Sequence, residues 1–226
     1  MTPVAPATNP AWGVTGQYAS RWPPSLAVVA AIVLFVTLPE KLSPGPRWVL
    51  PVLEAALLIP LLLTAPRRHV GESTWARVAS IVLIGLINVA DFVSLGLLVR
   101  EIVRGSHTSG HDLIFAAVQI WLTNVIVFGL WYWELDRGGP GPRAHSEHRE
   151  PDFLFPQMVT PEAAPAGWAP SFVDYLYVSL TNATAFSPTD TMPLTVWAKA
   201  LMGGQALASL VTVAVVAARA VNIIGG

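Results

Sequence analysis

Oxygen-bearing side chains gather in one short stretch between residues 184 and 190. Thr184, Ser187 and Thr189 supply hydroxyl groups, and Asp190 supplies a carboxylate. Such oxygens are ligands for hard cations, and a carboxylate favours cations over anions. Pro188 interrupts helical periodicity because proline fixes φ and lacks a backbone N–H. The stretch is therefore expected to be a non-helical loop that suits partly hydrated cations, the alternative being a collapsed plug in which Asp190 only accepts a structural hydrogen bond.

A second set of mostly polar side chains recurs along the last apolar stretch of the chain. At about 100° per residue, the set falls within a stripe about 80° wide on one helix face. Its members are Gln205, Ser209, Thr212, Val216 and Arg219. Such a seam is a candidate lining for an aqueous pathway. The alternative is a helix–helix contact, since small and hydroxyl residues let membrane helices approach closely and bond.

A third set of polar residues lies within apolar stretches earlier in the chain. Its members are Glu54, Asn88, Asp91 and Asn124, accompanied by Gln119 and Thr123. Acids at membrane depth usually face a partner or water. One interpretation is a buried polar network that relays protons or ions. The other is a structural hydrogen-bond cluster that ties the first three apolar stretches to the fourth.

The composition indicates what surrounds these residues. Hydrophobic residues make up 53% of the 226 positions and charged residues 12%, and the mean hydropathy is +0.54. A soluble domain needs a more polar surface than this. Five apolar stretches approach the roughly 20 residues that a helix needs to cross a membrane, at about residues 25–38, 48–64, 75–104, 112–133 and 196–224. We predict an all-α polytopic membrane protein with about five transmembrane helices. The Ala-, Val-, Pro- and Arg-rich residue usage is compatible with a GC-rich bacterial genome, so we expect it in a bacterial plasma membrane.

The chain divides into three regions. Residues 1–24 are expected to be a disordered tail, residues 25–111 a three-span membrane region, and residues 112–226 a separate module. In that module, residues 112–133 form a helix, and residues 134–170 form an aqueous linker whose charge and proline content cannot lie in lipid. Ser171 and Asp174 resemble a capping box, which predicts a short helix over 171–183. With the loop over 184–195 and the final helix over 196–224, this order indicates a re-entrant loop before the last span.

The re-entrant segment resembles a known family. Residues 171–193, SFVDYLYVSLTNATAFSPTDTMP, are similar to the pore helix and filter of two-span pore-loop potassium channels, which typically read FxDALYFSxxTxTTVGYGDxxP. The register needs no gaps. The matching positions are Phe172, Asp174, Leu176, Tyr177, Ser179, Leu180, Thr181, Thr184, Asp190 and Pro193. The resemblance covers about residues 112–224 and implies an outer helix, a pore helix and an inner helix, with four copies around one pore.

The departure from the family lies at its functional centre. In place of TVGYG stand Ala185, Phe186, Ser187, Pro188 and Thr189. Glycines allow the backbone conformations that aim rings of carbonyls at a dehydrated ion, so classical potassium selectivity is not expected. We predict a homotetrameric cation channel in which rings of hydroxyls and carboxylates hold monovalent cations. The alternative is a non-conducting membrane interaction or scaffold protein that keeps the pore-module architecture.

Other function classes have little support in the sequence. The chain has no cysteine, which excludes disulfides and thiolate chemistry. No nucleophile–base arrangement or phosphate loop is present, so neither an enzyme nor a cofactor is predicted. A net charge of −1 without a long basic block gives no reason to expect a nucleic-acid partner. With the loop outside, eight Lys and Arg residues would be external and five cytoplasmic, contrary to the positive-inside tendency.

Overall fold

The computed structural model describes residues 20–43, 45–46, 48–64, 74–104, 109–143, 150–165, 167–184 and 190–224. Eight helices, three short 3-10 turns and two strands follow one another in these ranges. In chain order they are α1 (Trp22–Val36), η2 (Glu40–Leu42), α2 (Val49–Thr64), α3 (Thr74–Val103), α4 (Gly110–Leu135), η4 (Asp136–Gly138), α5 (Pro140–Arg143), β1 (Phe153–Leu154), α6 (Pro156–Val159), η5 (Pro161–Ala163), α7 (Phe172–Thr184), β2 (Met192–Pro193) and α8 (Val196–Ile224).

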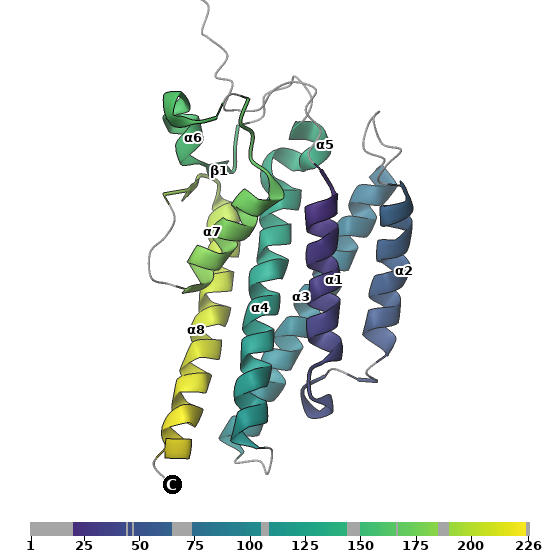
Figure 1. Cartoon of the computed structure of the whole chain (residues 1–226), viewed down its shortest axis with the longest axis vertical. Coiled ribbons are helices and arrows are strands. Elements are labelled where there is room, and N and C mark those ends of the chain that lie inside the picture. Colours follow the sequence, from purple (N-terminus) through teal and green to yellow (C-terminus); the bar gives the residue numbers. More distant parts are fainter. Residues whose placement is uncertain are drawn as a thin grey trace, which may run out of the picture.

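The long helices α1, α2, α3, α4 and α8 run side by side, and the short α7 crosses obliquely over α4 and α8 (Figure 1). The prediction of a mostly helical chain is confirmed, and the predicted helix ranges agree with the observed bounds to within a few residues. One boundary was wrong, because Pro23 and Pro24 lie in the first turn of α1 rather than in a tail. Proline is tolerated there because the first N–H groups of a helix lack intrahelical partners. Residues 1–19 lie outside the described residues.

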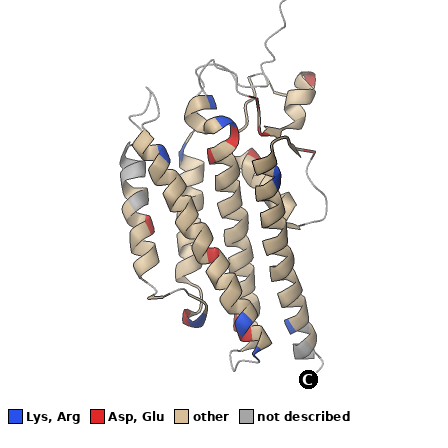
Figure 2. Ribbon diagram, turned by 180° about the vertical axis from the view of Figure 1, so that it is seen from behind, with Lys and Arg blue, Asp and Glu red and all other residues tan. Residues whose placement is uncertain are grey.

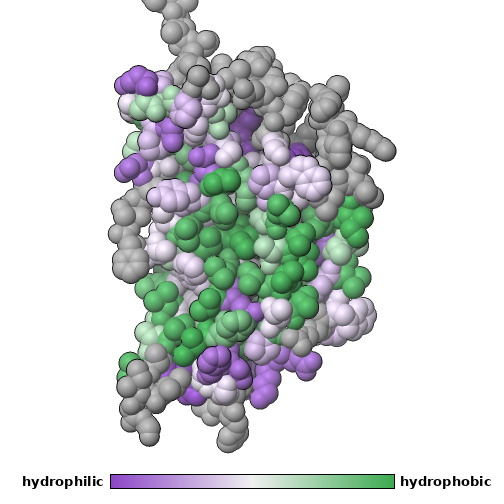
Figure 3. Space-filling model, in the orientation of Figure 1, coloured by the Kyte–Doolittle hydropathy of each residue, from purple (hydrophilic) through white to green (hydrophobic). Residues whose placement is uncertain are grey.

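Among the described residues, three helical segments are long and apolar enough to cross a membrane. They are Thr74–Val103, Gly110–Gly138 and Val196–Arg219. The apolar α1 has 15 residues and rises about 22 Å, less than the roughly 30 Å of hydrocarbon. Figure 3 shows a hydrophobic belt around the middle of one face with hydrophilic residues beyond it, and Lys and Arg lie mainly near the helix ends (Figure 2). These features are compatible with an integral membrane protein.

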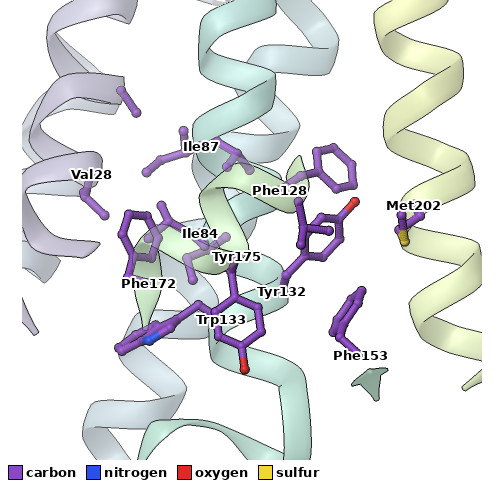
Figure 4. Close-up of a cluster of buried hydrophobic side chains, with 14 of the residues drawn as sticks. Val28, Ile84, Ile87, Phe128, Tyr132, Trp133, Phe153, Phe172, Tyr175 and Met202 are labelled. Atoms are coloured by element: carbon purple, nitrogen blue, oxygen red, sulfur yellow. The ribbon is translucent and has the colours of Figure 1, made fainter. Parts of the chain in front are cut away.

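Helix α4 is the centre of the packing and contacts α1, α3, α7 and α8. Its approach to α7 is close at Gly129, where an added Cβ would lie 3.2 Å from the Cα of Leu176. Aromatic rings fill the adjoining space between α4, α7 and α8 (Figure 4). The ring centroids of Tyr132 and Phe153 are 5.0 Å apart with the rings tilted by 49°, and the rings of Tyr175 and Phe153 are nearly perpendicular at 6.3 Å. This cluster fixes α7 on α4.

The segment predicted as an aqueous linker is only partly a linker. Phe153, Phe155 and Met158 are buried against the ends of α4 and α7. β1 pairs with β2 in antiparallel register, with Phe153 opposite Pro193 and Leu154 opposite Met192. The charged and proline-rich composition of residues 134–170 did not indicate that these apolar residues would be buried. The described part of the segment therefore forms a folded cap over one end of the bundle.

Candidate functional site: the α4–α7–α8 unit and the polar clusters

The start of α7 agrees with the capping box predicted from the sequence. The backbone N–H and the hydroxyl of Ser171 both donate to Asp174 Oδ2 at 2.7 Å. Phe172, Tyr175 and Val178 bury one face of the helix. The opposite face exposes Val173 and Tyr177, each 62% accessible.

Helix α7 ends within the length of the bundle, away from the end at which α8 starts. Both α7 and α8 begin at the capped end of the bundle, and α7 ends partway along α8 (Figure 1). At its last residue, the Thr184 hydroxyl donates to the Thr181 carbonyl at 3.0 Å. Asp190 is exposed. The predicted loop residues 185–189 lie outside the described residues, so their chemistry stays a prediction.

Gln205 of α8 joins three helices through hydrogen bonds. Its Nε2 donates to the Ser179 hydroxyl at 2.6 Å and to the Ser179 carbonyl at 2.9 Å. Its Oε1 accepts from the Tyr132 hydroxyl at 2.6 Å and from Asn182 Nδ2 at 2.8 Å. Ser179 in turn donates to the Val125 carbonyl at 2.6 Å. The network is buried and locks α7 between α4 and α8.

This network changes the interpretation of the polar seam on α8. Gln205, Ser209 and Thr212 are at most 3% exposed within one chain. The Ser209 hydroxyl donates to Asn124 Oδ1 of α4 at 3.4 Å. The seam, predicted as a pore lining, therefore faces α4 and α7 at Gln205 and Ser209, which matches the helix–helix alternative. The buried Thr212 hydroxyl donates to the Ala208 carbonyl of its own helix. Periodicity identifies a polar stripe, but it does not say which neighbour the stripe meets. Val216 and Arg219 are half-buried.

A buried ionic cluster at the capped end was not predicted from the sequence. Asp136, fully buried, accepts from the Tyr175 hydroxyl at 2.6 Å and from the Asp152 N–H at 2.8 Å. It also pairs with Arg137 Nε at 3.3 Å. Burial raises the pKa of the Tyr175 phenol well above its usual range, so the hydroxyl remains a donor.

The turn after α4 explains how Asp136 is placed. Arg137 adopts φ 52°, a conformation rare for non-glycine residues, and its N–H donates to Asp152 Oδ2 at 2.8 Å. Gly139 has φ 104°, and an added Cβ would lie 2.9 Å from the Glu134 carbonyl. The glycine pair after Asp136 and Arg137 was the one sequence signal of this tight turn. Arg143 closes it by donating to the carbonyls of Trp133 and Asp136, at 2.6 and 2.9 Å.

The third set of polar residues is only partly brought together. Glu54, Asp91, Gln119 and Thr123 line one small cavity among α1, α2, α3 and α4. Asn124 instead faces Ser209 on α8. Asn88 is half-buried, and its Nδ2 has no partner among the described residues. The predicted network therefore separates into an acid-lined cavity and an unrelated contact with α8.

Comparison with family models, curated proteins and solved structures finds no match to this chain.

Proposed function

We propose that this chain is the subunit of a homotetrameric cation channel without classical potassium selectivity. The observation that carries the proposal is the placement of α7, a short helix held between two long ones with its chain returning to the capped end. Irregular backbone at membrane depth is tolerated only where it is buried in protein or lines water. An oligomer around the loop would supply that environment.

The exposed faces of α7 and α8 support self-association. Val173, Tyr177 and Leu180 lie on α7 and are 39–62% exposed, whereas Leu207 and Leu210 on α8 are more than 60% exposed. In a tetramer, neighbouring subunits would cover part of this surface. The same residues would face lipid in a monomer, so the oligomeric state discriminates between these arrangements.

The structure changes which residues we place along the pathway. Because Gln205, Ser209 and Thr212 are buried within the subunit, they are assigned to subunit packing. The available face of α8 is small and apolar, and we place on it Gly203, Leu207, Leu210 and Ala214. Cation preference then comes from the loop, where Thr184 and the exposed Asp190 supply oxygens.

The proposed topology has five membrane spans, which are the three long helices α3, α4 and α8 together with α1 and α2. The long helices α1, α2, α3, α4 and α8 alternate in direction, and the cap and the start of α7 lie on the same side (Figure 1). We place the cap outside, as the channel resemblance implies. Arg137 and Arg143 contribute less to the excess of external basic residues than exposed side chains would. Within the cap, Arg137 pairs with Asp136, and Arg143 donates hydrogen bonds to backbone carbonyls.

Cysteine labelling tests this topology without background, since the chain has no cysteine. Glu150→Cys is exposed at the cap, and Arg104→Cys is exposed at the other end of the bundle. In intact cells, an impermeant thiol reagent is expected to label Glu150→Cys and to spare Arg104→Cys. Labelling of Glu150→Cys from the cytoplasmic side alone would contradict the proposed orientation.

Reconstitution in planar bilayers tests the function. We expect cation currents carried by both Na⁺ and K⁺, and a fourfold molecular mass in detergent. Asp190→Asn should weaken the preference for cations over anions, because a ring of carboxylates at the loop is lost. Glu150→Gln removes an exposed acid outside the loop and should leave selectivity unchanged. A monomer without current would contradict the proposal.

A non-conducting interaction or scaffold protein is the second candidate. This candidate is favoured because Gln205, Ser209 and Thr212 are buried within the subunit. The exposed face of α8 is therefore mostly apolar. A stable tetramer with no current for any ion would support this candidate.

A further inference from the structure

A second oxygen-lined position lies inside the helical bundle, away from α7 and α8. Glu54 on α2, Asp91 and Ser94 on α3, and Gln119 on α4 line the same cavity. All four side chains are at most 5% exposed. The cavity holds about 10 Å³, which is about the space that one water molecule or one dehydrated ion of similar size occupies.

Several oxygens at this cavity lack a partner. Glu54 Oε2, Ser94 Oγ and Gln119 Oε1 make no hydrogen bond to any described residue. Buried polar atoms are nearly always paired in native proteins, so three such atoms at one cavity call for a ligand. All three can accept a hydrogen bond or coordinate a cation.

The orientation of Gln119 is fixed by α1. The Thr37 hydroxyl donates to the carbonyls of Val33 and Leu34, so its oxygen is available only as an acceptor. Gln119 Nε2 donates to that oxygen at 2.7 Å and to the Leu34 carbonyl at 3.4 Å. The amide nitrogen must therefore face α1, which leaves Oε1 as the free acceptor.

The two carboxyl groups at the cavity also have no basic partner among the described residues. Glu54 and Asp91 are the titratable groups among the lining residues, and the contributions from α1 and α4 are apolar or neutral. Neither carboxyl pairs with a Lys or Arg among the described residues. Burying an unpaired carboxylate in an apolar bundle is costly. If one carboxyl carries a proton, a single positive charge neutralises the other.

We propose that Glu54, Asp91, Ser94 and Gln119 form an occluded binding site for one dehydrated monovalent cation of the size of Na⁺. Carboxylate, hydroxyl and amide oxygens suit such a hard cation. Mg²⁺ usually keeps several waters, for which this cavity has no room. The site lies outside the α7–α8 region, so it stands independently of the proposed conduction pathway.

Equilibrium dialysis of the purified full-length protein with radiolabelled Na⁺ tests the site. At constant ionic strength, balanced with N-methylglucamine, we expect saturable binding of one Na⁺ per chain and a rise in melting temperature that follows it. Glu54→Gln and Asp91→Asn should weaken binding by roughly tenfold or more, since even outer-shell changes at metal sites have effects of that size.

Two further variants keep the test decisive. Glu134→Gln removes another fully buried acid that lines a different cavity, and it should leave Na⁺ binding intact. If the charge-removing variants do not fold, Ser94→Ala deletes one ligand oxygen that has no partner among the described residues and should still weaken binding. No saturable Na⁺ binding, equal stabilisation by every salt, or a response to pH alone would overturn the proposal.

Discussion

The two polar interiors of this bundle use their side chains differently. At the α4–α7–α8 interface, Gln205 and Ser179 are bonded to each other and to neighbouring groups at 2.6–2.9 Å. In the α1–α4 interior, Ser94 Oγ and Gln119 Oε1 have no partner among the described residues. Bonded groups fix the position of a helix, whereas unbonded groups retain capacity for a ligand. The first interior is therefore assigned to structure and the second to binding.

The largest expected effect is at the cap that anchors α7. Asp136→Ala removes the carboxylate that pairs with Arg137 and accepts from Tyr175. Removing one partner of a buried ion pair should lower the free energy of unfolding by about 3–5 kcal/mol. Thermal unfolding in detergent would measure the loss. Glu150→Ala, at an exposed site, serves as the control and should change the free energy of unfolding little. A loss in Asp136→Ala no larger than that in the control would refute the role of the cap.

The close approach of α4 and α7 gives the next effect. Gly129→Ala places a Cβ 3.2 Å from both Cα and Cδ1 of Leu176, and overpacking of this kind costs about 1–3 kcal/mol. Gly96→Ala is the matched control on α3, where a Cβ meets no atom within 4 Å. We expect the control to be neutral or stabilised by up to about 1 kcal/mol. The same unfolding assay distinguishes the two variants, and equal changes in their free energy of unfolding would contradict the close contact.

A double-mutant cycle sharpens the assignment of Gln205 to structure. Tyr132→Phe and Gln205→Leu remove the two ends of one hydrogen bond, so their effects should couple by about 1 kcal/mol, as such bonds do within membrane proteins. Tyr132→Phe combined with Gly96→Ala, a substitution on another helix, should be additive to within about 0.5 kcal/mol. Additivity in the first pair would mean that the bond contributes nothing to stability.

The smallest effects compare two buried serines directly. Ser179→Ala loses a donor to the Val125 carbonyl and a partner of Gln205, which should cost about 1 kcal/mol. Ser94→Ala deletes a hydroxyl without a described partner. In Na⁺-free buffer its change should be within about 0.5 kcal/mol. A large loss for Ser94→Ala under these conditions would show that Ser94 is already bonded.

The sequence predicted where each helix lies along the chain better than it predicted which helices pack against one another. Apolar length and proline positions located the helices, and Ser171 with Asp174 located the start of α7. These are local signals. The direction that Gln205 faces depends on how α8 packs, and in a membrane protein a polar stripe has the same period whether it meets water or another helix.

Long-range pairing explains what was missed at the cap. Asp136 and Asp152 are separated by a charged segment that resembles an aqueous linker, yet the Asp152 N–H donates to Asp136 Oδ1 at 2.8 Å. Composition gives the average polarity of such a segment and not its partners. By contrast, Glu54 and Asp91 were predicted as one polar set, because an acid within an apolar helix stands out without any knowledge of packing.

The most direct test of the channel proposal is the current through reconstituted Leu207→Cys protein before and after a thiol reagent. Leu207 is 66% exposed on α8, and Val89→Cys, at a site 63% exposed on α3, is the control. The proposal predicts a cation current that the reagent reduces in Leu207→Cys and leaves unchanged in Val89→Cys and in the cysteine-free parent. The absence of current in all three proteins, or equal block of the two variants, would contradict a pathway along α8.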